Sequence, residues 1–215
     1  MEQLIKDIIF IGGGLELSLA LLLGSLCLGA ILGVTLSILR YNKIGHRFVQ
    51  LYVSLLRGTP LILQLSFIYF VLPCLTGLKL NVLTAGILAF GINSSAYLAE
   101  ILRAGIESIP KGQFEAAQAL KIPKYYTWKD IILPQVLRNS FPSLINEVIA
   151  LLKETALIGM ISGMDLMRMA QSLGAQQFTY FRPLCIVAAY YYGLVRLIEI
   201  GGKKIEKGGW YAPKN

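Results

Sequence analysis

The sequence predicts an all-α, polytopic membrane protein with five transmembrane helices, and three observations support this prediction. First, 55% of the 215 residues are hydrophobic and 15% are charged, whereas about 25% of an average soluble domain is charged. Second, residues 17–39, 58–78 and 80–99 carry no charge, and a helix of about 20 apolar residues crosses the hydrocarbon core of a bilayer. Third, two further apolar stretches follow at about 139–163 and 183–201.

The last two stretches differ from the first three because they contain charged residues. Glu147, Lys153 and Glu154 lie in the fourth, and Arg196 and Glu199 lie in the fifth. A charge inside the bilayer is costly and normally faces protein or a water-filled cavity. We therefore expect these two spans to face a solute pathway or a partner chain. For the three charges of the fourth span, pairing with another helix or a second subunit is favoured over contact with a solute.

The first and third spans are uninterrupted. The first is predicted from about residue 12 to 39 and contains Gly29 and Gly33, a small-xxx-small pair that permits close helix approach. The third is predicted over about 80–102, with a short polar run of Asn and Ser at 93–95 near its middle. Such side chains can hydrogen-bond a solute or a neighbouring helix.

The second span is predicted to be broken. A helix starts in the basic stretch near Gly45 and runs toward Leu56, where the residues Arg-Gly-Thr-Pro follow at 57–60. Pro60 has no backbone N–H, so a kink or break is expected there. The span then continues over 61–72. We interpret Arg57 as a structural residue beside this break.

A long cytoplasmic loop is predicted at about 109–139. A helix is predicted over 113–121, and a second short helix lies between Pro123 and Pro134. An apolar face is predicted on the first helix. The residues placed on it are Phe114, Ala117 and Leu120. A water-exposed helical hairpin between membrane spans is typical of a surface that docks a soluble partner.

The distribution of basic residues predicts the orientation. The net charge is +8, and with the N-terminus outside and the C-terminus inside, 16 of the 20 Lys and Arg fall on the cytoplasmic side, as the positive-inside tendency requires. The four outside are Lys6, Lys79, Arg168 and Arg182. Residues 164–181 are then a polar outside connection, and 203–215 form a basic, loosely ordered tail. No nucleic-acid binding is expected, because no basic patch carries stacking aromatics.

Enzyme chemistry on this chain is not expected. His46 is the only histidine, and Cys27, Cys74 and Cys185 are scattered through apolar sequence without metal-ligand spacing, so we interpret the cysteines as small apolar side chains. A phosphate-binding loop is not present in the sequence either. We expect no metal or cofactor on this chain. Residues 1–11 lack the basic start of a signal peptide, and 1–215 is predicted to be one transmembrane domain.

Five motifs resemble the polar amino acid permease family of ABC importers, the histidine/glutamine/arginine type. The motifs are LRGTPL at 56–61, NSSAYLAE at 93–100, SIPKGQFEAA at 108–117, LPQ at 133–135 and LKETAL at 152–157. Their order and spacing together are specific, and the resemblance covers nearly the whole chain.

The resemblance implies a permease subunit of the type I ABC importer kind in the bacterial cytoplasmic (inner) membrane. It implies a second permease chain, either identical or a sister chain, and two ATP-binding subunits that use ATP and Mg on the inside. It also implies an extracytoplasmic amino acid-binding protein that delivers the substrate.

The loop at 109–139 resembles the coupling helices that insert into the ATPase subunits. The residues to which the resemblance gives this role are Gly112, Glu115, Ala116, Ala117, Leu120, Lys121 and Pro134. The sequence departs from the family at Lys121, where Gly is usual and permits a left-handed turn. Ala156 also replaces a frequent Ser, and Gly14 a frequent Thr. Either the turn differs here or Lys121 is strained.

Candidate substrate-binding residues are polar side chains in or beside the spans. They are Glu16, Asn93, Ser94, Tyr97, Glu147 and Asp165. Glu16 lies about one turn into the first span from the outside, and an intramembrane carboxylate indicates a functional site. It predicts a cationic substrate such as arginine, lysine or histidine. Asp165 is equally suited to cap a helix, and Glu100 is spaced to pair with Arg103.

Three alternatives remain open. The permease could carry glutamine, cystine or another neutral or polar amino acid. An ion-coupled secondary carrier would work without an ATPase and is expected to show an internal repeat, which we do not find. A membrane-embedded enzyme would need a clustered nucleophile or metal set, which the sequence lacks.

Overall fold

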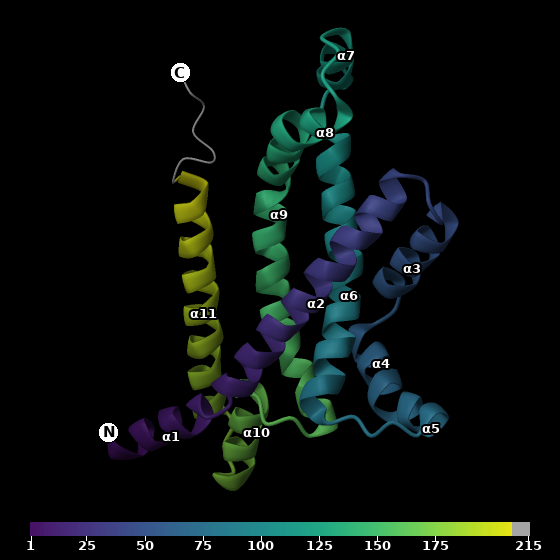
Figure 1. Ribbon diagram of the computed structural model, residues 1–215. Helices are drawn as coiled ribbons and strands as arrows, with labels where there is room; N and C mark the ends of the chain where they lie inside the picture. The colour runs from purple at the N-terminus through teal and green to yellow at the C-terminus, as the bar shows by residue number, and fades with distance from the viewer. Residues whose placement is uncertain (208–215) are drawn as a thin grey trace.

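The computed structural model describes residues 1–207, and every regular element in this range is helical, with η marking the π- and 3-10 segments (Figure 1). In chain order the elements are α1 (Glu2–Gly12), α2 (Leu15–Tyr41), α3 (His46–Gly58), α4 (Leu61–Ser66), η1 (Phe67–Val71), α5 (Leu72–Thr76), α6 (Val82–Glu107), α7 (Lys111–Ala119), α8 (Lys124–Tyr126), η2 (Thr127–Ile132), α9 (Leu133–Glu154), η3 (Thr155–Ile161), α10 (Leu166–Gln176) and α11 (Phe181–Lys207). The all-α prediction is confirmed.

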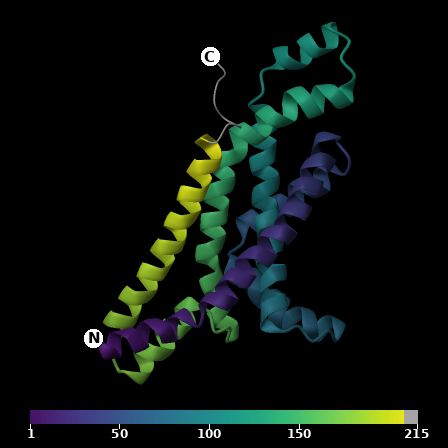
Figure 2. The ribbon, with the colours of Figure 1, turned by 60° about the vertical axis from the view of Figure 1, so that its left-hand side comes forward.

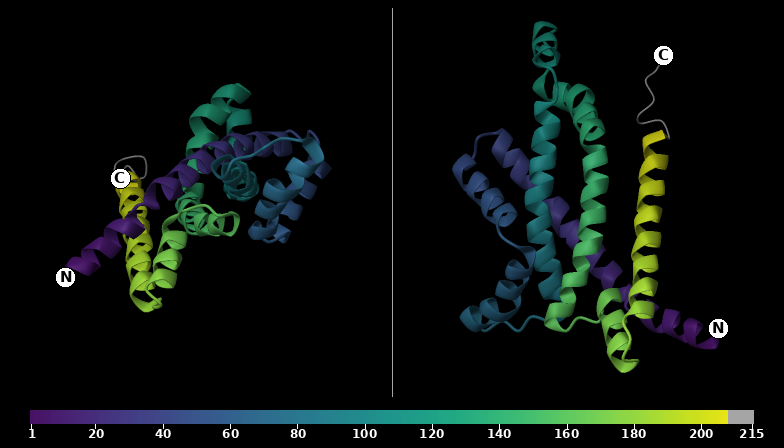
Figure 3. Two further views of the ribbon diagram at one scale, coloured as in Figure 1. Left: turned by 90° about the horizontal axis from the view of Figure 1, so that it is seen from below. Right: turned by 180° about the vertical axis from the view of Figure 1, so that it is seen from behind.

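Three helices in residues 1–207 are long and apolar enough to cross a membrane, or four if the bent pair α3 and α4–α5 counts as one span. The three are α2 with α1, α6 and α11. The fourth predicted span corresponds to α9, which is less apolar than that standard but stands beside α6 and α11 over a similar length (Figure 3). The predicted number of five is therefore approximate.

Helix α2 crosses the other long helices obliquely and packs most extensively against α6 (Figure 1). Two glycines make this contact close. A Cβ atom added to Gly33 would lie 2.8 Å from Cβ of Leu98, and one added to Gly29 would lie 3.2 Å from Cβ of Ser94. Because Cβ atoms do not approach other atoms this closely without displacement, the small-xxx-small pair sets the distance between the two helices.

The second span is broken where the sequence predicts it. The chain bends by 103° between α3 and α4, and Thr59 and Pro60 adopt extended backbone conformations there. Carbonyl groups near a broken helix end need other donors. Gln64 Nε2 supplies them, because it donates to the carbonyl oxygens of Leu56 at 2.8 Å and Thr59 at 3.2 Å.

Two predicted helix boundaries near α9 are wrong, and the predicted outside connection contains a helix. The fourth span does not begin at 139, because α9 begins at Leu133, and its α-helical part ends at Glu154 before the 3-10 segment η3. Pro134 was predicted to follow the end of a helix, but it lies in the first turn of α9. Proline is tolerated there because the N–H groups of the first turn have no partner within the helix. Residues 164–181 contain the helix α10.

The C-terminal tail is also more regular than predicted as far as Lys207, where α11 ends. The rest of the predicted loose tail, 208–215, lies outside the described residues. The hairpin formed by α7, α8 and η2 projects from the same end of the molecule as the end of α11, whereas α1 and α10 lie at the opposite end (Figure 2).

Candidate substrate pathway and coupling loop

A buried hydrogen bond joins the middle of α6 to α9. Ser94 Oγ donates to Glu147 Oε1 at 2.7 Å, and the Ser94 side chain is buried between α2, α6 and α9. A carboxylate in a membrane span is costly unless it faces a partner or water. The structure thus brings together two predicted site residues from different helices. Glu147 remains partly accessible beyond this contact.

An amide pair lies at the broken span. Asn93 Nδ2 donates to Gln64 Oε1 at 3.1 Å and to the Leu56 carbonyl oxygen at 3.3 Å. Asn93 thus connects α6 to both sides of the break. Sequence reasoning missed Gln64, although an amide side chain four residues after Pro60 in an apolar span was a usable signal.

Tyr97 lies one turn farther along α6, toward the hairpin end. Its ring lies under the Arg57 guanidinium, with 5.3 Å between the guanidinium carbon and the ring centroid. Such a cation–π contact favours a fixed position for both side chains. Arg57, interpreted from sequence as a structural residue of the break, therefore also contacts α6.

The two predicted residues at the opposite end are in different environments. Glu16 lies in the first turn of α2 and is exposed. Asp165 is fully buried and caps α10, accepting from the N–H groups of Met167 and Arg168, both at 3.0 Å. Burial raises the pKa of the Asp165 carboxyl, and these N–H groups oppose the rise. The capping alternative is the one the structure shows.

Sequence reasoning missed one partner of Asp165. Tyr191 of α11 donates its hydroxyl to Asp165 Oδ2 at 3.3 Å, and the Leu166 N–H donates to Ser18 Oγ of α2 at 3.3 Å. The start of α10 is therefore fixed to two spans. Sequence spacing carries no signal for either contact, because the partners are far apart in the chain.

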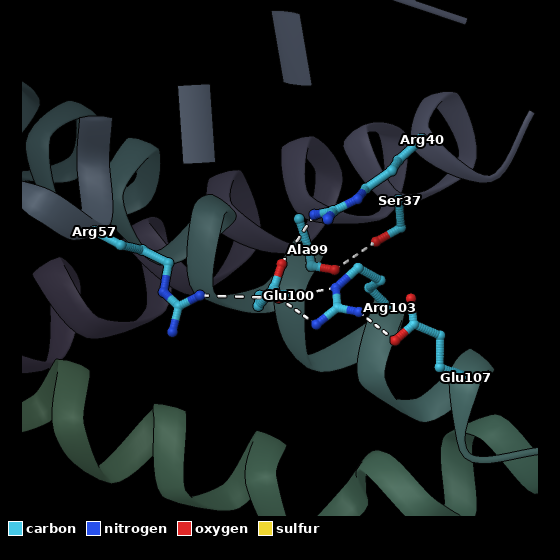
Figure 4. A network of polar contacts seen from close by, with 7 residues as sticks. All are labelled: Ser37, Arg40, Arg57, Ala99, Glu100, Arg103 and Glu107. Atoms are coloured by element: carbon cyan, nitrogen blue, oxygen red, sulfur yellow. Dashed lines mark hydrogen bonds and ion pairs between the residues drawn. The ribbon is translucent and has the colours of Figure 1, made fainter. Parts of the chain in front are cut away.

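Glu100 is surrounded by three arginines near the hairpin end of α6 (Figure 4). Arg40 of α2 donates Nη1 to Glu100 Oε2 at 2.9 Å, and Arg103 donates to Oε1, which confirms the predicted local pair. Arg103 also pairs with Glu107. Arg57 is more distant, with 4.0 Å between its Nη1 and Glu100 Oε1.

The projecting hairpin has an inner and an outer face. Ala117 is buried and Phe114 half-buried against Trp128, whose ring centroid lies 6.2 Å from that of Phe114. Trp128 also contacts the ring of Tyr41 at the end of α2, at 4.6 Å. Leu120 was predicted on the inner face, but it is 74% exposed because it follows the end of α7.

The other residues assigned to coupling lie on the surface. They are Gly112, Glu115, Ala116, Lys121 and Pro134. Lys121 has φ of +55°, so it adopts the left-handed conformation that Gly would occupy more readily. Its N–H donates to the Gln118 carbonyl at 2.9 Å. The turn is therefore formed despite the substitution, at a conformational cost of about 1–2 kcal/mol.

The described residues hold no group of three or more His, Cys, Asp or Glu side chains arranged for a metal ion. A broken span, buried polar contacts between spans and an exposed helical hairpin at one end are instead features of a membrane transport subunit. Residues 25–200 match the family described as binding-protein-dependent transport system inner membrane component. The chain belongs to this family, and it is therefore an inner-membrane transport subunit of a system that includes a binding protein.

The names of similar proteins support the amino acid class. The chain is 48% identical over 212 residues to a protein of Rickettsia typhi named as a putative glutamine transport system permease protein, covering 96% of this chain and 97% of the relative. It is 41% identical to the arginine transport system permease protein of Bacillus subtilis, covering 94% of each. The chain is thus an amino acid ABC transporter permease.

Two solved structures share the fold. An amino acid ABC transporter crystallised with histidines superposes with a TM-score of 0.87 at 33% identity, covering 95% of this chain and 96% of that one. An inward-facing methionine ABC transporter superposes with a TM-score of 0.71 at 20% identity, covering 95% of each chain. The second likeness shows the fold alone.

Proposed function

We propose that this chain is a single permease domain that passes a polar amino acid inward, with the side chains at the α6–α9 contact forming part of the pathway. The observation that carries this proposal is the Ser94–Glu147 hydrogen bond. It places a partly accessible carboxylate between two membrane-crossing helices, and such a group indicates a solute site. Asn93 and Tyr97 lie within one turn of Ser94 on α6.

The proposed orientation places α1 outside and the hairpin inside. The N-terminal helix and the hairpin lie at opposite ends of the molecule, and the end of α11 lies on the hairpin side (Figure 1). This arrangement agrees with the basic charge of the segments at that end. Two ATP-binding subunits, with ATP and Mg, would then dock on the hairpin, and a second permease chain would complete the pathway.

Glu115 offers a direct test of docking. Its carboxylate is exposed on α7, where a partner cation can reach it. Glu115→Lys is expected to reduce co-purification of the ATPase at least about tenfold, since reversing an interface charge costs more than 1.4 kcal/mol. Glu206→Lys, an exposed charge reversal on α11, is the control. Wild-type co-purification and uptake by Glu115→Lys would contradict this role.

Two substrate classes are each favoured by a different observation. The carboxylates of Glu147 and Glu16 favour a cationic amino acid such as arginine, lysine or histidine. The Gln64–Asn93 amide pair favours glutamine, as does the name of the Rickettsia typhi relative. We propose the cationic class, because Glu147 is a carboxylate within the helix bundle. Asp165, which is occupied as a cap, supports the pathway only by holding α10 in place.

Competition between labelled arginine and labelled glutamine tests this choice. The reconstituted transporter with its ATPase and binding protein takes up one or both. For a cationic substrate, Glu147→Gln should lower arginine uptake about tenfold or more while any glutamine uptake persists. Arginine uptake equal to wild type in Glu147→Gln would contradict the cationic assignment. Equal loss of both would indicate a general role of Glu147 in the pathway.

A further inference from the structure

Two open cavities meet at the contact between Arg57 and Glu100. The first, about 290 Å³, lies between α6 and α9 and the end of α3. The second, about 400 Å³, lies between α2, α3 and α6. Arg57 and Glu100 line both cavities. The smaller cavity is close to the lower size of small-molecule sites, about 300 Å³, and so is suited to a ligand the size of an amino acid.

The charges around these cavities do not balance. Arg40, Arg57 and Arg103 supply three positive charges, and Glu100 and Glu107 supply two negative charges, which leaves one positive charge in excess. Arg40 and Arg103 hold these carboxylates through hydrogen bonds (Figure 4). The excess positive charge is therefore that of Arg57.

Arg57 makes a long ion pair with Glu100 and no hydrogen bond with it. The 4.0 Å between its Nη1 and Glu100 Oε1 exceeds hydrogen-bond length, and its side chain is 43% exposed. A cation–π contact with the Tyr97 ring restricts its position. Apolar packing of Val49 and Val53 against α6 holds the rest of α3 in place. Within the described residues no hydrogen bond is formed by the Arg57 guanidinium, and such a group at a cavity wall matches the geometry of a carboxylate.

The opposite wall of the smaller cavity offers oxygen acceptors. It is lined by Ser108 at the end of α6 and by Asn139, Ser140 and Ser143 in the first half of α9. Hydroxyl and amide oxygens accept hydrogen bonds from an ammonium group. One wall thus suits a carboxylate and the other suits an ammonium, which is the pair of charges that every free amino acid carries.

We propose that this cavity is an exit site, where the α-carboxylate of the transported amino acid binds Arg57 after leaving the middle of the membrane. The proposal rests on the proposed function, because it assumes that the hairpin end faces the cytoplasm. The site recognises only the zwitterionic backbone of the amino acid. It does not include Glu147, and it does not discriminate between the side chains of different amino acids. Free amino acid inside the cell would occupy it and slow further release.

The test uses the complete transporter with its ATPase and binding protein, reconstituted so that the internal amino acid concentration is set before external uptake begins. The probe is internal L-glutamine or L-arginine, whichever the transporter carries. Wild-type initial uptake should fall as the internal concentration rises. Arg57→Gln should raise the half-inhibitory internal concentration about tenfold, the loss expected for one charge-assisted contact of about 1.4 kcal/mol.

A second probe isolates the carboxylate. The methyl ester of the same amino acid lacks the carboxylate charge, so it should inhibit wild type about tenfold less strongly than the acid does. In Arg57→Gln the acid and the ester should inhibit equally. Arg57→Lys keeps the charge without the planar fork and should give an intermediate result. Arg196→Gln, which removes an exposed arginine of α11, is the matched control and should behave as wild type.

Three outcomes would overturn the exit site. They are a wild type that is insensitive to internal amino acid, an Arg57→Gln variant with unchanged sensitivity, and an equal change in Arg196→Gln. All three outcomes are compatible with ATP-driven uptake from the outside, so they would leave the proposed function intact. A transporter that shows no ATP-driven uptake at all would instead contradict the proposed function.

Discussion

Helices α6 and α11 resemble each other in sequence and differ in surroundings. Both contain a 26-residue helical segment, and the most apolar 18 residues of each have the same mean hydropathy. In the most apolar part of α6, 61% of the residues are buried in the chain, whereas the value for α11 is 6%. Hydropathy therefore indicates that a helix lies in the membrane, but not what it contacts there.

The difference follows from side-chain size and polarity. The middle of α6 contains Gly91 and the polar run 93–95, which allow close approach and offer hydrogen bonds. The corresponding part of α11 presents large apolar side chains outward, including Leu197, which is 67% exposed, and Ile200. Between spans, packing and hydrogen bonds replace the hydrophobic effect as the source of association. Helix α6 is thus a core helix, and α11 presents its apolar face to lipid or to another chain.

The largest effect should come from enlarging a glycine at the α6 contact. Gly33→Leu would place a Cβ 2.8 Å from Leu98 Cβ and 3.0 Å from the Ser95 carbonyl oxygen. Overpacking of this kind costs about 1–3 kcal/mol and sometimes more. We expect a loss of monodisperse protein in size-exclusion chromatography and a lower melting temperature in detergent.

The matched control is Gly201→Leu on α11, because no atom lies within 4 Å of the added Cβ. It should leave the elution profile and melting temperature unchanged. Equal destabilisation by the two substitutions would contradict the contrast between the two helices.

A smaller effect is expected from Ser94→Ala. The change removes the donor to Glu147, and hydrogen bonds between membrane helices contribute about 0.5–1.5 kcal/mol. The melting temperature should fall by about 2–4 °C for each kcal/mol lost. Ser172→Ala on α10, where the hydroxyl accepts a long hydrogen bond of 3.4 Å from the exposed Gln176 side chain, is the control. A Ser94→Ala melting temperature equal to wild type would show that Glu147 is already hydrated.

The smallest effect is expected on α11. Arg196 pairs with Glu199 at 2.6 Å, but both side chains are partly exposed, and exposed i, i+3 pairs contribute less than about 0.5 kcal/mol. Arg196→Gln should therefore change the melting temperature by no more than about 1–2 °C. A larger fall would indicate that another chain covers this part of α11.

The sequence predicts the features of α6 and its neighbours that depend on local pattern. The helical class, the close glycine pair, the break at Pro60 and the Glu100–Arg103 pair are all confirmed. These features follow from spacing along one helix or from the chemistry of single residues, which a sequence displays directly.

The contacts that the sequence does not predict join distant segments. Arg40 meets Glu100, Gln64 meets Asn93, and Tyr191 meets Asp165 only because the helices cross at particular angles. The same limit explains why α9 was predicted to start six residues late. Its first turns contain Pro134, Gln135 and Arg138, and they are helical because Val136, with Ile132 just before α9, packs against Ile109.

Trp128 of the hairpin contacts the end of the oblique helix α2. Helix α2 crosses α6 obliquely, packs closely against it at Gly29 and Gly33, and ends at Tyr41 against the indole of Trp128. The contact at the two glycines would act as a pivot for α2. A displacement of the hairpin would therefore move the opposite end of α2, with Glu16, in the opposite direction. Helix α2 would thus transmit a displacement of the hairpin from one side of the bilayer to the other.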